Sequence, residues 1–215
     1  LDLPFVSERA DVRATARREH RSIEDAAHHV RHAFFIRAAA ALGADVVALG
    51  HTMDDQAETV LLRLLRGAGT RGLAAMRPKR GVVIRPLLAT SREAVHAFLR
   101  ERGIDALQDA SNDDRSIPRN RVRAELLPLL TSRFNPRIVQ TLALEADLAR
   151  EDEAYFAPLV DAWVAEHVRR PKDGVVQLER AALASVPTAV AWRVLHLLMR
   201  EAAGRRPVSK IHVAL

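Results

Sequence analysis

The stretch GHTMDDQAETVLLRLLRGAG, residues 50–69, decides the fold because it joins a short apolar segment to an amphipathic helix through a group of polar side chains. The overlapping residues 45–50, DVVALG, predict a buried strand, and the leucines that follow recur with helical period. In open α/β sheets, ligands bind at the carboxyl ends of the strands, where the next helix presents unpaired N–H groups. The stretch therefore predicts a ligand site at a strand–helix junction.

Four polar residues mark this junction: His51, Asp54, Asp55 and Glu58. We expect the two aspartates to cap the helix, the glutamate to lie one turn further on, and the histidine to reach an anion above them. Because helix caps of this kind are common, a cap followed by a solvated acidic first turn is the alternative interpretation.

The composition is that of a soluble globular protein, long enough at 215 residues for one substantial domain or for a medium and a small one. No apolar run approaches the roughly 20 residues of a membrane span, so we expect a cytoplasmic protein with no membrane partner. The lack of cysteine excludes disulfides, thiolate metal sites and a cysteine nucleophile. A net charge of +6 indicates a polyanionic partner, while 4% aromatic residues argue against a face that stacks many unpaired bases.

Helices and strands alternate around the junction. Residues 22–42 predict a helix that begins with a capping box formed by Ser22 and Asp25 and ends at Gly43. The other segments predict a strand within residues 1–12, a loop at 67–81, a strand at 82–88 ended by Pro86, and a helix at 92–102. Apolar strands without period-two patterning, separated by helices, favour an α/β fold with a parallel sheet covered by helices.

A second polar group lies in residues 109–130, DASNDDRSIPRNRVRAELLPLL. Its proline is suited to a first helical position, and Arg119 and Arg123 then share one helix face as a two-pronged cation for phosphate oxygens. Asn112 and Asn120 offer directional hydrogen bonds. A solvated basic helix end is the alternative interpretation. Beyond this group, residues 137–168 predict one or two long helices, and residues 175–215 hold helical patterns around Trp192.

Two blocks resemble the tRNA(Ile)-lysidine synthetases, which are N-type ATP-pyrophosphatases. GHTMDDQAETVLLRLLRGAGTRGLAAM resembles the family's G-H-x-x-D-D-Q-x-E-T-x-L-x-R-L-x-R-G-x-G-x-x-G-L, and SNDDRSIPRNRVRAELLPLL resembles S-N-x-D through R-N-x-(I/V)-R-x-x-L-x-P-x-L. EDAAHHVRHAFF and IRPLLATSREAVHAFLRERGI give weaker support, and the resemblance extends over roughly residues 5–165. The resemblance implies a partial nucleotide-binding domain of the adenine-nucleotide alpha-hydrolase type in residues 1–130, a helical linker in 131–170, and a small helical tRNA-binding region in 171–215.

The activity that the resemblance implies is ATP-dependent ligation of L-lysine to the wobble cytidine of a tRNA(Ile) with a CAU anticodon, through an adenylated cytidine, with Mg2+. By similarity, His51 and Asp55 lie near the nucleotide phosphates and Mg2+, whose ligands are not identified. Glu58 positions or deprotonates a reactant, Arg31 contacts substrate or phosphate, and Asn112 and Arg123 hold the reacting cytidine. For tRNA binding, the expected residues are Arg71, Arg77, Lys79, Arg80 and Arg119. A homodimer is left open.

Departures from the family pattern matter as well. The phosphate-binding S-G-G-x-D-S loop is absent from these 215 residues, so we expect the chain to be a fragment that is inactive alone. His28 stands where the pattern A-R-x-x-R-Y has arginine, and His32 replaces its aromatic residue. The three histidines of HHVRH indicate polar residues on a helix surface more than they indicate a metal site.

Two other functions stay open at this point. A non-catalytic tRNA-binding fragment is compatible with the basic charge and the missing loop. Another adenylating tRNA-modifying enzyme of the same superfamily would use the same ATP chemistry, although thiolating relatives generally rely on cysteines, which this chain lacks.

Overall fold

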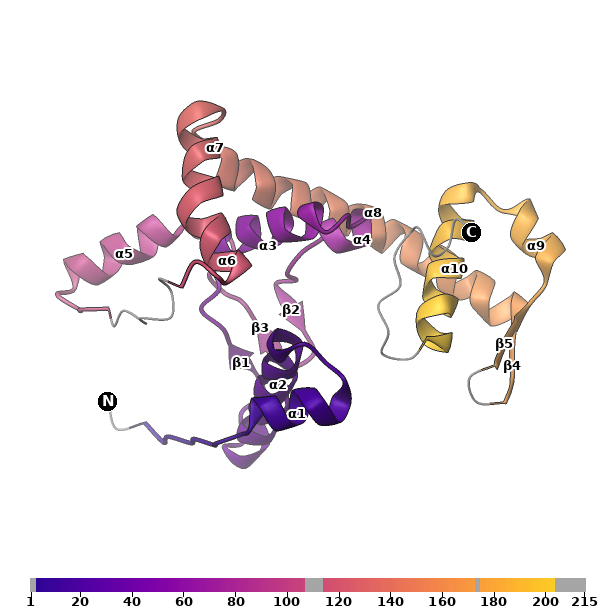
Figure 1. The fold of residues 1–215 in the computed structure, drawn as a ribbon, viewed down its shortest axis with the longest axis horizontal. Helices are drawn as coiled ribbons and strands as arrows, with labels where there is room; N and C mark the ends of the chain where they lie inside the picture. Colours follow the sequence, from indigo (N-terminus) through magenta and orange to yellow (C-terminus); the bar gives the residue numbers. More distant parts are fainter. Residues whose placement is uncertain (1–2, 107–113, 173–174, 204–215) are drawn as a thin grey trace. The chain divides into compact units, whose positions relative to one another are not determined.

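The computed structural model describes residues 3–106, 114–172 and 175–203. The chain divides into two compact units, one formed by Leu1–Thr52 with Arg77–Ser91 and the other by Met53–Met76 with Arg92–Leu215 (Figure 1). Each unit therefore contains segments that are distant in the sequence. Among the described residues, no helix combines the length and apolar character that a membrane crossing requires.

The first unit begins with irregular backbone over residues 3–11, followed by α1 (Val12–Glu19). Asp11 caps this helix by accepting a hydrogen bond from the Ala14 N–H at 2.8 Å. The strand predicted within residues 1–12 is therefore wrong for the described part of that segment. Leu3 and Phe5 are exposed to 70% and 87%, so they do not make the packing contacts that favour a strand.

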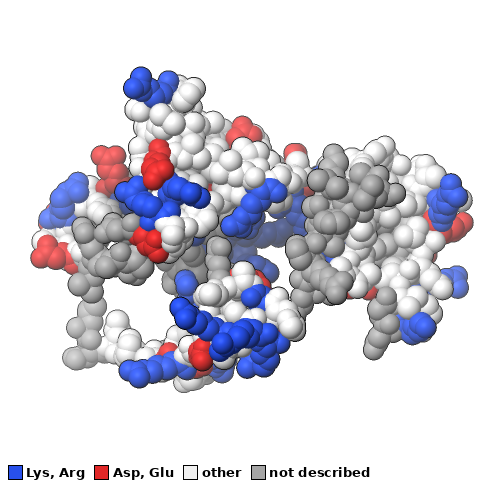
Figure 2. Space-filling view, viewed as in Figure 1, with Lys and Arg blue, Asp and Glu red and all other residues white. Residues whose placement is uncertain are grey.

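Cationic side chains are concentrated around α1. Arg13, Arg17 and Arg18 are exposed on this helix, and Figure 2 shows Lys and Arg side chains gathered over it. A basic face of this kind attracts polyanions, in agreement with the net charge of the chain.

The predicted helix at 22–42 is confirmed as α2 (Ile23–Ala41). The Ser22 hydroxyl accepts a hydrogen bond from the Asp25 N–H, and Gly43 follows the helix with a φ of +63°, a left-handed conformation that glycine adopts without strain. Ala26 on this helix is fully buried.

A three-stranded sheet completes the first unit, in the order β1 (Val47–Ala48), β3 (Val83–Ile84), β2 (Lys79–Arg80). β1 runs parallel to β3, with Val47 opposite Val83, whereas β2 is antiparallel to β3. The strands predicted at 45–50 and 82–88 thus exist but span two residues each. The expectation that residues 45–50 are buried is wrong, because β1 lies at the sheet edge, where Ala48 is exposed, while Val83 on the central strand is fully buried.

The second unit is mainly helical. Its elements are α3 (Met53–Leu65), α4 (Thr70–Leu73), α5 (Arg92–Glu101), α6 (Pro118–Arg121), the π-helical turn η2 (Val122–Leu126), α7 (Leu127–Arg133), α8 (Ile138–His167), β4 (Val168–Lys172), β5 (Val175–Leu178), α9 (Arg180–Ser185) and α10 (Thr188–Ala202). The helix predicted at 92–102 and the long helix within 137–168 are confirmed. The segment 67–81, predicted as a loop, contains both α4 and β2, so that prediction is wrong.

Two apolar clusters hold the second unit together. The first joins α3, η2, α7 and the start of α8 through Ala57, Leu61, Val122 and Leu127, and Figure 1 shows α3 lying along α8. The second cluster packs the end of α8 against α10 around Trp163 and Val194. Between these helices, β4 and β5 form an antiparallel hairpin, so the prediction of helix from residue 175 is wrong at 175–178. The β-branched pair Val175 and Val176 favours a strand there.

Candidate functional site

The carboxylate of Glu58 lies at the centre of a group of charged side chains from α3, α5 and α6–η2. Arg123 donates from Nε and Nη2 to its two oxygens at 2.7 and 3.0 Å, and Arg119 donates from Nε at 2.7 Å. Arg92 donates from Nη2 at 3.2 Å. Both Glu58 oxygens therefore accept two hydrogen bonds each, which is the full capacity of a carboxylate.

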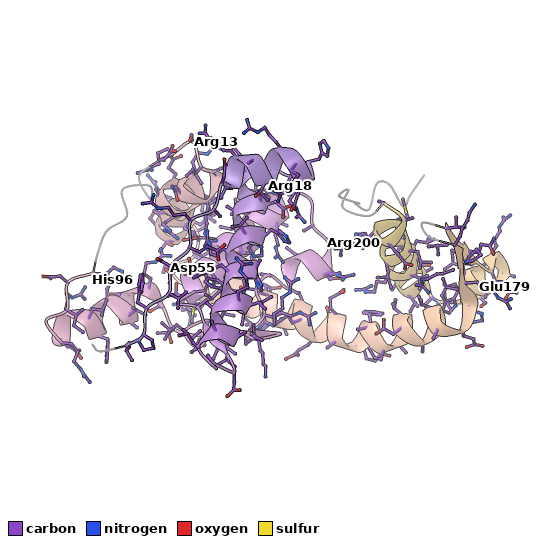
Figure 3. All side chains as sticks on the ribbon, turned by 90° about the horizontal axis from the view of Figure 1, so that it is seen from below. Arg13, Arg18, Asp55, His96, Glu179 and Arg200 are labelled. Carbon is purple, nitrogen blue, oxygen red and sulfur yellow. The ribbon has the colours of Figure 1, made fainter. Side chains whose placement is uncertain are left out.

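Asp55, which Figure 3 labels on α3, contacts the same three arginines. Its Oδ1 accepts from the Nη2 atoms of Arg119, Arg92 and Arg123 at 2.9, 3.3 and 3.3 Å. We refer to Asp55, Glu58, Arg92, Arg119 and Arg123 as the arginine cluster. Asp55 and Glu58 are three residues apart and Arg119 and Arg123 four, which explains why the side chains of each segment reach the cluster together.

Local sequence sets these positions. Pro118 begins α6, as predicted, and the buried Asn120 side chain donates to the Asp114 carbonyl at 3.0 Å, which fixes the turn before the helix. Asp54 and Asp55 lie inside the first turn of α3 rather than at its N-cap. The Asp54 carboxylate instead accepts from the Arg92 N–H at 2.7 Å and so caps α5, a helix that follows in the sequence by 38 residues.

Burial and charge separate the cluster from an ordinary helix end. The Glu58 side chain is fully buried and that of Asp55 is 14% exposed, while the three guanidinium side chains are 29–34% exposed. The hydrogen bond to Glu58 raises the pKa of Arg123 above its ordinary value, against the opposing effect of burial. The alternatives of a solvated acidic turn and a solvated basic helix end are therefore wrong for these residues.

His51 belongs to the first unit, where it follows β1 and is half-buried. Arg85, which directly follows β3, donates from Nε to the His51 Nδ1 at 3.3 Å and from Nη1 to the Arg77 carbonyl at 2.8 Å. Burial, together with the positive charge of Arg80, lowers the pKa of Arg85. An arginine that is short of compensating negative charge favours an anion close by.

Arg31 and Arg80, predicted for substrate and tRNA binding, both act on His28 within the first unit. The pKa of His28 is lowered mainly by burial and further by the charges of His32, Arg80 and Arg31. Arg80 is exposed on β2, and Arg31 is exposed on α2. The remaining predicted tRNA contacts outside the cluster, Arg71, Arg77 and Lys79, are also exposed, whereas Asn112 lies outside the described residues.

The predicted site residues fit the two implied cofactors, Mg2+ and ATP, to different extents. Among the residues that the structure describes, no group of three or more histidine, aspartate or glutamate side chains is placed to hold a metal ion. Asp55 and Glu58 moreover face arginines, which repel a divalent cation, so these carboxylates do not fit Mg2+ ligands. A nucleotide phosphate fits the arginine cluster better, because its three guanidinium groups are donors suited to anions.

Arg85 and Arg92 are the two site residues that sequence reasoning missed. Both lie in IRPLLATSREAV, a segment that gave only weak support to the family resemblance. Neither arginine lies three or four residues from a polar residue of the two blocks that resemble the family, so helical spacing could not select them. The available signal was their position, Arg85 near the end of a predicted strand and Arg92 at the start of a predicted helix, where ligand sites concentrate in α/β folds.

Comparisons with known proteins agree with the two sequence blocks. The chain is 48% identical over 174 residues to the tRNA(Ile)-lysidine synthase of Geobacter sulfurreducens, a match that covers 80% of this chain and 37% of the relative. The corresponding enzyme of Solibacter usitatus is 42% identical over 184 residues (85% and 42%), and that of Thermus thermophilus is 37% identical over 215 residues (100% and 41%). The chain thus spans about two fifths of the length of these curated relatives.

These similarities confirm the resemblance to tRNA(Ile)-lysidine synthetases that the motifs indicated. The sequence model of the PP-loop domain matches residues 1–130, which is more than half of the chain. The matched residues include the whole arginine cluster as well as His51 and Arg85. The chain belongs to the PP-loop domain family.

Proposed function

We propose that the protein acts in the ATP-dependent formation of lysidine on a tRNA(Ile) with a CAU anticodon. The observation that carries the proposal is the arginine cluster, in which two sequence blocks that resemble the lysidine synthetases meet in one buried charged site. The similarity to relatives named tRNA(Ile)-lysidine synthase supports the same reaction. The PP-loop match supports a nucleotide-binding fold of the adenine-nucleotide alpha-hydrolase type.

The chemistry has two steps. The C2 oxygen of cytidine attacks the α-phosphorus of ATP, so that an O–P bond forms and pyrophosphate leaves. The lysine ε-amine, as the free base, then attacks C2, and the C2–O bond breaks so that AMP leaves with the oxygen while the nitrogen loses a proton. The first step is needed because a pyrimidine C2 oxygen is a poor leaving group until it is adenylated. Cationic side chains that face the departing phosphates favour both steps.

The roles of individual residues belong to the proposal. His51 and Asp55 act next to the nucleotide phosphates, Arg31 contacts substrate, and Arg123 holds the reacting cytidine or its adenylate, together with Asn112. For Glu58, positioning is better supported than proton transfer, because both of its oxygens already accept two hydrogen bonds from arginines. No Mg2+ ligand is assigned to the described residues.

Exposed cations support a tRNA surface. Arg71, Arg77, Lys79 and Arg80 are exposed, and Arg119 belongs to the arginine cluster. Neutralising the four exposed residues is expected to weaken tRNA binding and to reduce the salt dependence of log Kd by about 0.7–0.9 for each phosphate that is no longer neutralised. Unchanged binding at two salt concentrations would remove this surface from the proposal. The cytoplasm, where charged ATP and tRNA are at hand, is the proposed location, and a homodimer stays untested.

Lysidine formation tests the proposal directly. The protein is expressed from its complete reading frame and incubated with ATP, lysine and a tRNA(Ile) transcript, and lysidine is measured by mass spectrometry of digested nucleosides. We expect product from the native protein and none from His51→Ala, Glu58→Ala or Arg123→Ala. Arg133→Ala, an exposed residue at the end of α7, is the control and should retain activity.

Three results would contradict the proposal in different ways. Retained activity in all three variants would remove the assigned roles. Binding of tRNA without any ATP–pyrophosphate exchange by the native protein would indicate a non-catalytic tRNA-binding function. Exchange with adenylation of a different tRNA would indicate another enzyme of the same superfamily.

A further inference from the structure

Arg92 stands out because the family resemblance assigns it no role, although it contacts both carboxylates of the arginine cluster. Its Nη2 lies 3.3 Å from the Asp55 Oδ1 and 3.2 Å from the Glu58 Oε1. Arg119 and Arg123 contact the same two residues. The three guanidinium groups thus surround the same pair of carboxylates, although they come from two segments of the chain.

We propose that Arg92 is a third ligand-contacting arginine of this site, which together with Arg119 and Arg123 receives a phosphate group carrying two negative charges. The inference rests on the proposed function insofar as that phosphate belongs to a nucleotide or to the pyrophosphate it releases. Free phosphate, pyrophosphate and AMP share the chemistry that such a site recognises, and the experiment below separates them.

Hydrogen-bond capacity is the first argument. A guanidinium group has five N–H donors in a planar fork. In the described part of the chain, the side-chain hydrogen bonds of Arg92 start from Nη2 alone, which leaves Nε and Nη1 for a ligand. The side chain of Arg92 is 30% exposed, close to the 34% of Arg119 and the 29% of Arg123. Each arginine therefore faces the carboxylates with one edge and keeps part of its surface accessible.

Charge is the second argument. The cluster holds three guanidinium groups and two carboxylates, and the neighbouring Asp54 adds a third negative charge. Removing Arg92 would take away one of the three positive charges, and the attraction for a phosphate would fall accordingly. Charge is worth more here than in open water, since Glu58 is fully buried and the effective dielectric constant is lower.

A purely structural role explains Arg92 less well. Without Arg92, Glu58 still accepts three hydrogen bonds from Arg119 and Arg123, so the buried carboxylate keeps its compensating charges. Arg92 also anchors α5 through its backbone N–H, which bonds to Asp54 whatever the side chain at position 92 is. The guanidinium is thus surplus to the needs of folding, and a substitution that removes it should leave a folded protein.

Anion binding tests the inference. The protein, its Arg92→Gln and Arg92→Lys variants, and the control Arg100→Gln are titrated with inorganic phosphate, pyrophosphate and AMP at low ionic strength by calorimetry. Arg100 lies on the same helix and is exposed, so its removal changes the net charge equally without touching the cluster. We expect Arg92→Gln to raise the Kd for pyrophosphate at least about tenfold, Arg92→Lys to raise it about threefold, and Arg100→Gln to change it less than about twofold.

The pattern of outcomes decides the question. Unchanged affinity of folded Arg92→Gln, or an equal loss in Arg100→Gln, would overturn the inference. If Arg92→Gln fails to fold, the inference is tested by the Nε–H resonance of Arg92 in the native protein. This resonance is assigned by its absence from the spectrum of Arg92→Lys. A saturable shift of that resonance with pyrophosphate supports ligand contact, and a resonance that does not move refutes it.

The arms of the titration separate this inference from the proposed function. Tighter binding of AMP or pyrophosphate than of inorganic phosphate would place a nucleotide product in the site, whereas equal binding would indicate a site for free phosphate. Anion binding that depends on Arg92, in a protein that forms no lysidine, leaves the inference standing and contradicts the proposed function. Lysidine formation by a protein whose anion affinity does not depend on Arg92 contradicts the inference and leaves the proposed function standing.

Discussion

Replacing Glu58 with glutamine should destabilise the second unit strongly, since it removes the central charge of the arginine cluster. The Glu58 carboxylate is fully buried and accepts four hydrogen bonds of 2.7–3.2 Å from three guanidinium groups. An amide carries the same shape but turns one acceptor oxygen into an N–H2 donor, which then faces an arginine donor. The cluster would also keep three positive charges around Asp55 alone.

The size of the effect follows from burial. Removing one partner of a buried ion pair generally costs about 3–5 kcal/mol. The three arginine side chains are 29–34% exposed and can turn partly toward solvent, so screening places the expected loss near the lower end, at about 3 kcal/mol. For a protein of this length, that loss lowers Tm by roughly 6–12 °C.

Urea denaturation measures this loss, followed by circular dichroism at the helix band and by tryptophan fluorescence. Both tryptophans, Trp163 and Trp192, belong to the second unit, so fluorescence reports on that unit alone. Glu145→Gln, an exposed position on α8, is the matched control and should change the free energy of unfolding by less than about 0.5 kcal/mol. A loss below about 1 kcal/mol in Glu58→Gln would refute the reasoning, because it would mean that the buried carboxylate is not held by the arginines.

Two further predictions concern the first unit and the second apolar cluster. The pKa of His28 is lowered in the folded chain, so below the ordinary histidine pKa of 6.5 the unfolded chain binds more protons than the folded chain. The contribution of His28 to stability is therefore fully present above pH 6.5 and is lost as the pH falls through the lowered pKa. The groups that face His28 are His32 and Arg31 on α2, Arg80 on β2, and Asp25, whose charge opposes the shift. His28→Gln should flatten the decline in stability below about pH 6.5, and nuclear magnetic resonance of the imidazole should give a midpoint below 6.5 in the native protein; an unshifted midpoint would contradict the lowered pKa. Val194→Ala removes two methyl groups from a fully buried position and should cost about 2 kcal/mol in urea denaturation. Leu159→Ala, at a residue 43% exposed on α8, is its control; equal losses in the two variants would argue against the packing around Val194.

Local sequence predicted the helices well. The helix within residues 22–42 was found from a hydroxyl three residues before a carboxylate and from a glycine at its end, and both features occur in α2. Such signals work because capping and helical period act within a few residues of each other. The same reasoning placed Arg119 and Arg123 on one face, four residues apart, where both reach Glu58.

Predictions failed where pairing or packing with another segment decides the conformation. Residues 1–12 have an apolar start that suits a strand, but Leu3 and Phe5 are exposed and the described backbone of this segment is irregular before α1. Residues 175–178 lie in a segment with helical patterns, yet they pair with Val168–Lys172 as a hairpin. Strand formation depends on a partner and on packing, which local propensity does not contain.

The sequence by itself determined which chemical groups the site has: two carboxylates one helical turn apart in one block, and two arginines one turn apart in another. Only the tertiary structure decided that these groups meet, since Glu58 is separated from Arg119 by 61 residues and from Arg123 by 65. Tertiary structure also added Arg92, 34 residues from Glu58, and buried the Glu58 carboxylate, for which the sequence left a solvated turn open as the alternative. The physical reason is that helical spacing is a short-range property, whereas burial and the pairing of charges depend on the path of the whole chain.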